Sequence, residues 1–143
     1  MSANRSRGEV KTYRRYIKKL SGNVCEFCNI ANTPNQVVAS TDSFYVIKNL
    51  FPYSLWDNQS VADHLMIIPK RHVDSLAAFS PQEASEFLKL LSEYESQGYN
   101  VYARAPGSKI KTVVHQHTHL IKPKGKMRKF IIFARKPYIR FVA

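Results

Sequence analysis

Three histidines at alternating positions constrain this chain more than any other feature. His115, His117 and His119 lie in the segment 113–121, which begins and ends with apolar residues and which we predict to be a strand. Side chains alternate between the two faces of a strand, so the three imidazoles are expected to share one face, spread over about 13 Å. Three polar rings on one face need hydrogen-bonding partners. The pattern therefore indicates a functional cleft rather than passive core packing.

The other histidines and both cysteines fall into two further compact stretches. His64 and His72 flank an apolar run that ends at a proline, and Cys25 and Cys28 are spaced as C-x-x-C. In a reducing compartment this cysteine spacing favours a metal site or a redox pair, and two cysteines with two histidines complete a tetrahedral zinc site. A neutral imidazole is instead suited to nucleophilic attack on phosphorus. Five histidines are enough for both chemistries.

One long helix interrupts a series of strand-like segments. Ser80, Pro81 and Glu83 form a capping box with proline at the first helical position, and Gly98 is expected to end the helix. Apolar residues at helical spacing predict its core face: Ala84, Phe87, Leu88, Leu91 and Tyr94. The order of elements predicts an α+β domain, an antiparallel β-sheet with one main helix packed on it. Other expected elements are a basic helix at 11–20, a turn at 32–36, strands at 37–40, 44–47, 65–68, 100–103, 130–134 and 138–142, and an irregular segment at 49–63.

Positive charge is concentrated at the two ends of the chain. The 143 residues carry a net charge of +12; residues 1–19 hold seven Lys or Arg and one Glu, and residues 122–143 hold eight Lys or Arg and no acid. We therefore predict a basic N-terminal extension at 1–21 and one domain at 22–143 that includes a basic region from about 122. Such ends attract nucleic acid and other polyanions. No apolar run approaches the ~20 residues of a membrane span, and the basic N-terminus lacks the apolar core of a secretory signal, so we predict a cytoplasmic protein without a membrane partner.

Three motifs carry a resemblance to a known family. The stretch HQHTHLI at 115–121 resembles the H-x-H-x-H signature of the histidine triad (HIT) superfamily of nucleotide hydrolases and transferases. The stretch HLMIIPKRH at 64–72 resembles the family's second histidine motif, and CEFCNI at 25–30 resembles the zinc-binding start of many bacterial members. The three pieces occur in the family's order over roughly residues 25–123. The resemblance implies an antiparallel sheet with a packed helix and association as a homodimer.

The resemblance also implies a reaction and roles for its residues. His117 would attack the α-phosphorus of a nucleoside phosphoramidate, dinucleoside polyphosphate or related compound and form a covalent nucleotidyl-histidine. His119 and His64 would flank the α-phosphate and assist charge and proton movements, with His115 beside them. A structural zinc ion would be held by Cys25, Cys28, His72 and His115.

The nucleotide-binding residues follow from weaker likenesses. Residues 47–53 resemble the N-x-(aromatic)-P-Y segment of the dinucleoside-polyphosphate branch. Asn49 would then bind the ribose hydroxyls and Leu50 or Phe51 the base, although core packing explains Leu50 and Phe51 nearly as well. Thr112 stands where the family often has serine and would donate to a phosphate oxygen. Further phosphate candidates are Arg104, Ser108 and Lys109.

The sequence departs from the family pattern in three places and leaves two other functions open. The stretch 54–63 is longer than the family pattern leads us to expect, which predicts a lid or specificity loop there. Gln116 and Thr118 replace apolar residues, which predicts a wetter or partner-covered opposite sheet face, and residues 110–112 replace the usual G-Q-S. The first alternative is a non-catalytic nucleic-acid or ribosome-associated binding protein that uses the basic termini, with steeply salt-dependent affinity. The second is a hydrolytic metal site on His115, His117 and His119, which chelation would inactivate.

Overall fold

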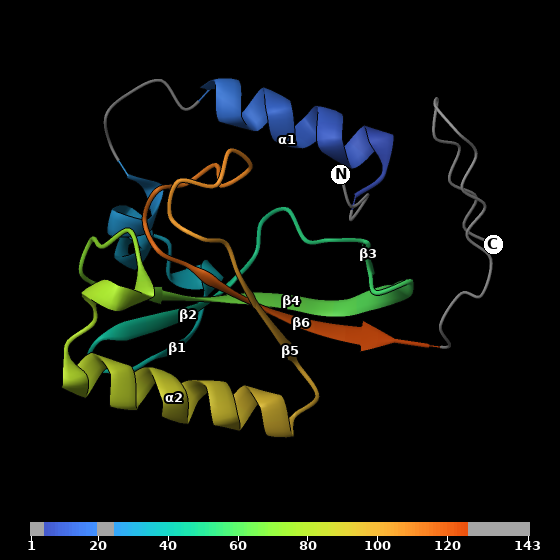
Figure 1. Cartoon of the computed structure of the whole chain (residues 1–143). Coiled ribbons are helices and arrows are strands. Elements are labelled where there is room, and N and C mark those ends of the chain that lie inside the picture. The colour runs from blue at the N-terminus through green and yellow to red at the C-terminus, as the bar shows by residue number, and fades with distance from the viewer. Residues whose placement is uncertain (1–4, 20–24, 126–143) are drawn as a thin grey trace.

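The computed structural model describes residues 5–19 and 25–125, and a six-stranded antiparallel sheet forms its centre (Figure 1). The strands run in the order β1-β2-β4-β6-β5, and the short β3 pairs with β4. The predicted α+β class with an antiparallel sheet is therefore confirmed. The bounds of the strands are β1 Val37–Ser40, β2 Phe44–Lys48, β3 Leu55–Trp56, β4 Gln59–Pro69, β5 Asn100–Ala103 and β6 Thr118–Lys124.

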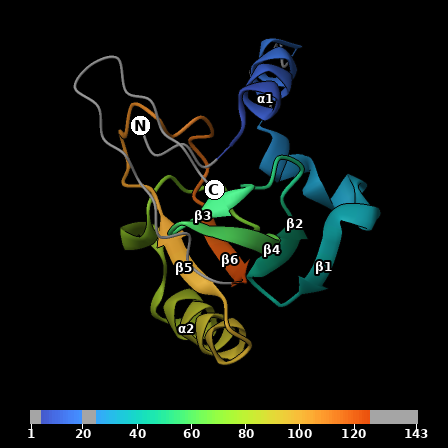
Figure 2. The same ribbon diagram turned by 90° about the vertical axis from the view of Figure 1, so that its right-hand side faces the viewer.

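The sheet separates an apolar layer from the layer that holds the histidines. Helix α2 (Pro81–Ser96) covers one face, and helix α1 (Arg7–Lys19) lies over the other (Figures 1 and 2). Leu65 and Ile67 of β4 belong to the core cluster that includes residues of α2, whereas Met66 belongs to a second cluster. Because residues alternate along a strand, His64 lies on the same face as Met66. The central strand thus presents His64 toward the α1 side.

Helix α2 begins at the predicted capping box. Ser80 Oγ accepts from the Glu83 backbone N–H at 3.1 Å, and the Glu83 carboxylate accepts from the Ser80 N–H at 2.7 Å. Gly98 follows the helix with a φ of +87°, a conformation that glycine adopts without steric cost. Leu88 is 63% exposed, so its predicted place in the core is wrong. The core face of α2 is instead centred on Phe87, Leu90 and Tyr94, which are all buried.

Helix α1 starts four residues earlier than the segment 11–20 that we predicted. The reason is a second reciprocal cap, in which Ser6 Oγ accepts from the Glu9 N–H and the Glu9 carboxylate accepts from the Ser6 N–H. The helix is two-sided. Tyr13, Tyr16 and Ile17 line a pocket over the sheet, whereas the opposite side carries the exposed cations Lys11, Arg14, Arg15 and Lys18.

The predicted strand at 113–121 is wrong in its first half. Strand β6 begins at Thr118, where its pairing with β4 starts opposite Ile67. The backbone of β4 continues only to Pro69, and the Pro69 carbonyl oxygen accepts a hydrogen bond from the His115 ring at 2.9 Å. The His115 side chain therefore occupies the hydrogen-bonding position on Pro69 that the backbone of a paired strand would use. Residues 113–117 accordingly leave the sheet as an irregular segment.

The segment 49–63 is more ordered than the irregular stretch we predicted. It contains β3 and the first part of β4, which pair with each other. Asp57 and Asn58, with φ of 47° and 61°, join the two strands. Positive φ at both central residues is typical of the type I′ turns that close tight hairpins. The sequence Asp-Asn is a weaker hairpin signal than Asn-Gly, which explains the error.

The sheet face that carries Gln116 and Thr118 was expected to be wetter or covered by a partner, yet both side chains are only 2% exposed. Gln116 Oε1 accepts from Lys111 Nζ at 3.1 Å. Thr118 lies opposite Ile67 and Ala103 in the sheet, and its Oγ1 has no hydrogen-bonding partner among the described residues. A buried hydroxyl without a partner is an energetic cost to the fold.

Thr118→Val is therefore expected to raise the free energy of unfolding by about 1 kcal/mol, because it removes the unpaired hydroxyl and keeps the branched shape. Chemical denaturation at neutral pH measures the change. Thr118→Ser is the matched control, since it keeps the hydroxyl, removes a methyl group and should lower stability. A valine variant as unstable as the serine variant would show that the hydroxyl is bonded in solution.

Some predicted elements lie outside the described residues. These are the strands at 130–134 and 138–142 and the predicted boundary between residues 21 and 22. Within residues 5–19 and 25–125, no helix combines the length and the apolar character that crossing a membrane requires.

Candidate active site

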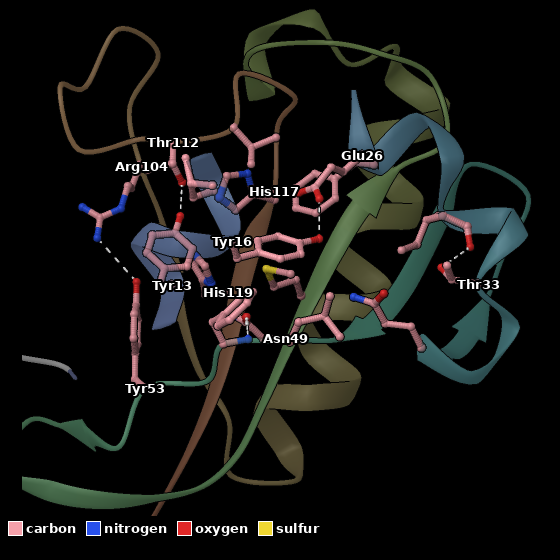
Figure 3. Close-up of a pocket in the computed structure, with 18 of the residues that line it drawn as sticks. Tyr13, Tyr16, Glu26, Thr33, Asn49, Tyr53, Arg104, Thr112, His117 and His119 are labelled. Atoms are coloured by element: carbon pink, nitrogen blue, oxygen red, sulfur yellow. Dashed lines mark hydrogen bonds between the residues drawn. The ribbon is translucent and has the colours of Figure 1, made fainter. Parts of the chain in front are cut away.

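A pocket of about 380 Å³ lies between the sheet and α1, and it contains two of the three alternating histidines. His117 comes from the irregular segment before β6 and His119 from β6 itself, with ring centres 5.1 Å apart (Figure 3). Asn49 and Tyr53, from the segment after β2, form part of the same wall. The pocket therefore gathers side chains from the central strands and from the loops at one end of the sheet.

His117 is held in one tautomer by its own backbone neighbourhood. Its Nδ1 lies 2.9 Å from the His115 carbonyl oxygen, which can only accept, so Nδ1 carries the proton. In the neutral ring Nε2 then has a free lone pair. The side chain is 7% exposed and its ring packs edge-on against Phe27 at 5.3 Å. His117 thus offers an oriented, unprotonated nitrogen at the pocket.

His64 and His119 form a hydrogen-bonded pair behind His117. The Tyr53 backbone N–H donates to His64 Nδ1 at 3.0 Å, which assigns the proton of neutral His64 to Nε2. That nitrogen lies 2.9 Å from His119 Nδ1, which accepts, so His119 carries its own proton on Nε2. Asn49 adjoins the pair. Its Oδ1 accepts from the Phe51 N–H, whereas its Nδ2 lies 3.1 Å from His64 Nε2, where two donors meet and no hydrogen bond forms in this tautomer. The result is one imidazole with a free lone pair beside another with a free N–H.

The pKa of each of the three rings lies below the usual value of histidine, which favours the neutral form. Burial lowers the pKa of His64 to about 4, and the charge of Arg5 lowers it further than Asp63 raises it. Burial also lowers the pKa of His119 strongly, with contributions from His64 and His117. The pKa of His117 is lowered by burial against the opposing effect of its hydrogen bond to His115. Neutral rings at physiological pH match one nucleophile and one proton donor.

The pH dependence of stability should reveal the buried His64. Its pKa is about 4 in the folded protein and near 6.5 when unfolded, so the unfolded chain binds the proton more tightly. The contribution is complete above about pH 6.5, and about 3 kcal/mol of stability is lost as the pH falls to 4. Denaturant unfolding between pH 7 and 4 should show a smaller loss for His64→Gln than for the wild type. Parallel losses in the two proteins would contradict this assignment.

The third alternating histidine, His115, belongs to a different cluster. Cys25, Cys28, His72 and His115 bring four potential ligand atoms within 4.8 Å of one another. His115 Nε2 donates to the Pro69 carbonyl, so its Nδ1 lone pair faces the sulfur atoms of Cys25 at 3.4 Å and Cys28 at 3.6 Å. His72 Nδ1 lies 3.2 Å from Cys28 Sγ. These spacings suit tetrahedral coordination with metal–sulfur bonds of about 2.3 Å and metal–nitrogen bonds of about 2.0 Å, and the four residues can hold a metal ion.

The Cys/His cluster is joined to the pocket through the residues between the cysteines. Phe27 packs against His115 at 5.9 Å and against His117 at 5.3 Å. The neighbouring Glu26 accepts a hydrogen bond from the Tyr16 hydroxyl of α1. The turn that carries the cysteines therefore supports both His117 and α1.

The structure places some of the predicted nucleotide-binding residues in the pocket and others outside it. Asn49, Leu50, Phe51, Arg104 and Thr112 all line the pocket, and Leu50 is 57% exposed, so it is not a core residue. Ser108 and Lys109, which we predicted as further phosphate ligands, are not among the lining residues. They lie instead in the turn at 105–111, where the Ser108 N–H donates to the Ala105 carbonyl.

Several pocket residues were not expected from the sequence. Arg5, Tyr13 and Tyr16 come from the N-terminal segment that we had separated from the domain. The Tyr13 hydroxyl hydrogen-bonds Thr112 Oγ1 at 2.5 Å, and the rings of Tyr13 and Tyr16 pack on Phe51 at 5.3 and 4.8 Å. The signals were the S-x-x-E cap at 6–9 and the helical spacing of the apolar and aromatic side chains that follow it.

Comparisons with known proteins agree with this fold. The HIT domain model matches residues 31–126, and no curated protein matches significantly. A histidine triad protein from Clostridium difficile has 23% identity and a TM-score of 0.55 over 78% of this chain and 99% of its own. A HIT family hydrolase from Clostridium thermocellum has 20% identity and a TM-score of 0.55 over 78% of this chain and 100% of its own. A histidine triad nucleotide-binding protein from Candida albicans has 23% identity and a TM-score of 0.52 over 71% and 76%. At such identities the likeness to these structures concerns the fold, while the family match spans most of the chain: the protein belongs to the HIT family of nucleotide hydrolases and transferases.

Proposed function

We propose that this protein is a nucleotidyl hydrolase or transferase in which His117 is the nucleophile. The observation that carries the proposal is the hydrogen bond from His117 Nδ1 to the His115 carbonyl, which leaves the Nε2 lone pair free in the pocket. Burial lowers the pKa of this ring and of its neighbour His119, which favours the neutral form of both. A nucleophile and a proton donor within one pocket are the minimum for displacement at phosphorus.

The reaction would proceed in two displacements. His117 Nε2 attacks the α-phosphorus, the bond to the leaving group breaks, and the leaving group keeps the electron pair. His119 Nε2–H lies ready to protonate a leaving amine or alkoxide, and His64 Nε2–H, bonded to His119 Nδ1, stabilises the ring that has lost its proton. A water molecule or another acceptor then attacks the nucleotidyl-histidine and returns its proton to His119.

The substrate would be oriented by groups on both sides of the histidines. We assign the ribose to Asn49 and the base to the wall formed by Leu50 and Phe51, which Tyr16 of α1 completes. Arg104 and Thr112 lie in the same pocket and are suited to the charge that develops on the phosphoryl oxygens. These assignments fit a nucleoside phosphoramidate, a dinucleoside polyphosphate or a related nucleotidylated compound.

A zinc ion is the metal that best fits the Cys/His cluster. Two thiolates and two imidazoles leave no open coordination position for water, so the ion would be structural. The donor set and spacings at Cys25, Cys28, His72 and His115 support this choice. A cytoplasmic environment, as predicted from the sequence, would keep both thiols reduced and available to the metal. With His115 engaged there, a hydrolytic metal site on the three alternating histidines is disfavoured.

Covalent labelling tests the mechanism. The protein is mixed with adenosine phosphoramidate or a dinucleoside polyphosphate labelled at the α-phosphate, quenched within one turnover, digested and analysed for an acid-labile label. Label on the peptide that contains His117 is the expected result. Label on another residue would contradict the assignment of the nucleophile.

A binding protein without turnover is the alternative outcome. The specific observation that favours it is the outer side of α1, where Lys11, Arg14, Arg15 and Lys18 are exposed and make no salt bridge within the described residues. Neither label nor turnover with either substrate, together with RNA affinity that falls steeply as salt rises, would establish this second function.

We also propose that the protein forms a homodimer through strand β5. Within the described part of the chain, β5 is the last strand of the sheet, and Val101 on it is 45% exposed. An uncovered edge strand is able to pair with another chain. Val101→Lys should therefore weaken association at least about tenfold by placing charge at the interface. Sedimentation velocity measures the effect, and a wild-type protein that is monomeric at high concentration would contradict the proposal.

A further inference from the structure

Arg5 lies before α1, outside the part of the chain that matches the HIT family, yet it reaches the active-site pocket. Its Nε and Nη2 donate to the Phe51 carbonyl at 3.2 and 2.5 Å. Its guanidinium also lies over the rings of Tyr13 and Tyr53, 4.7 Å from each ring centre. The side chain is thus fixed by a backbone oxygen and two aromatic faces, and no carboxylate forms a salt bridge with it among the described residues.

A second guanidinium reaches Tyr53 as well. Arg104 Nη2 is 3.4 Å from the Tyr53 hydroxyl, and its guanidinium lies over Tyr102 at 5.2 Å. The Tyr53 ring in turn packs against His64 at 4.6 Å and His119 at 5.7 Å. Two permanent cations therefore converge beside the histidine that would protonate the leaving group.

The opposite end of the pocket has a different character. Figure 3 shows Arg104 and Tyr53 on one side of His117 and His119, and Glu26 and Thr33 on the other. Glu26 is the carboxylate that lines the pocket, and it already accepts from the Tyr16 hydroxyl. The charge is thus asymmetric, with the two arginines at one end. One α-phosphoryl group does not require two arginines, and an amine leaving group would gain nothing from them. A chain of phosphates beyond the scissile bond matches this end by charge and by the planar donors of arginine.

We propose that Arg5 binds the phosphates of the leaving group, so that the site selects nucleotides whose leaving group is itself phosphorylated. This inference rests on the proposed function for the identity of the bond that breaks. When the bond between the α-phosphorus and the bridging oxygen breaks, the leaving phosphate chain keeps the electron pair and gains negative charge. Arg5 binds that charge directly, while Arg104 beside it binds the α-phosphoryl oxygens, and no proton is needed for the departure. A segment that precedes the family domain thereby sets the substrate preference.

A comparison of two substrates tests Arg5 with an internal control. For Arg5→Gln, kcat/KM with diadenosine tetraphosphate should fall about 10- to 100-fold, the usual effect of losing a charged hydrogen bond, while kcat/KM with adenosine 5′-phosphoramidate stays within about threefold. Arg5→Lys should retain an intermediate activity with the tetraphosphate because it keeps the charge and loses the planar fork. Arg14→Gln on the exposed side of α1 removes the same charge away from the pocket and should change neither value. Equal losses on both substrates for Arg5→Gln would overturn the proposal in favour of a structural role, and so would no loss on either.

Binding of unreactive ligands separates this proposal from the proposed function. By titration calorimetry, Arg5→Gln should weaken the affinity for α,β-methylene-ATP, in which a CH₂ group replaces the bridging oxygen, about tenfold or more and leave the affinity for AMP unchanged, because only the triphosphate analogue carries phosphates beyond the α position. Wild-type protein without turnover of either substrate would contradict the nucleotidyl-histidine mechanism, and the affinities for α,β-methylene-ATP and AMP would still decide the role of Arg5. An equal change in both affinities would show that Arg5 contacts the nucleoside or the α-phosphate and would overturn the proposal.

Discussion

Replacement of His117 by alanine is expected to lower kcat by about 10⁴-fold or more with every substrate, because the nitrogen that forms the covalent bond is lost. Among the described residues, neither of the other two alternating histidines offers a free lone pair in the pocket. His119 Nδ1 accepts from His64 and its Nε2 carries a proton, and His115 is turned toward the two cysteines. Steady-state kinetics with adenosine phosphoramidate and a dinucleoside polyphosphate measure the loss.

A second variant separates chemistry from structure at this position. His117→Asn keeps an N–H that can donate to the His115 carbonyl and should be as inactive as the alanine variant, with less disturbance of the fold. Val114→Ala is the matched control, since Val114 is 67% exposed in the same irregular segment and should retain full activity. Turnover by either His117 variant, in protein whose unfolding temperature is unchanged, would exclude His117 as the nucleophile.

Local sequence patterns predicted much of this fold, because the helices and strands concerned are specified by residues close together in the sequence. The cap at Ser80 and Glu83 fixed the start of α2, and the apolar run at 65–68 indicated the buried part of β4. The irregular course of 113–117 was not predictable from such signals. It depends on the hydrogen bond from His115 to the Pro69 carbonyl, which joins residues 46 positions apart.

The candidate site was predictable to a similar degree and for similar reasons. The motifs brought out the histidines and the four possible metal ligands, because each motif is a short run of chemically distinctive residues. They did not bring out Arg5, Tyr13 or Tyr16, whose residue types are ordinary in a basic helix. What makes them pocket residues is the docking of α1 over the sheet, and that depends on long-range contacts such as the bond from Tyr13 to Thr112. The resemblance to the family had implied that His115 lies with the cysteines and His117 apart from them, and the structure places His115 in the Cys/His cluster and His117 in the pocket.

Removal of the metal is expected to lower both stability and activity. A metal at 1,000 times its dissociation constant contributes about 4 kcal/mol to stability. In a domain of this size each kcal/mol shifts the unfolding temperature by about 3 °C, so a strong chelator should lower it by about 10 °C. Turnover should fall as well, since Phe27 lies between the two cysteines and packs on His117. Metal analysis, calorimetric melting and kinetics before and after chelation measure the three quantities.

A ligand variant makes this prediction selective. Cys28→Ser removes one ligand of the cluster, so the variant should melt near the temperature of the chelated wild type, and the chelator should have no further effect on it. If chelation acted through some other site, it would lower the unfolding temperature of both proteins equally. Metal-loaded wild type that keeps its unfolding temperature after complete removal of the ion would show that the cluster does not brace the fold. Because the ion would touch neither substrate nor His117, a drop in kcat that returns when zinc is added back would place its effect in the support of the His117 segment through Phe27.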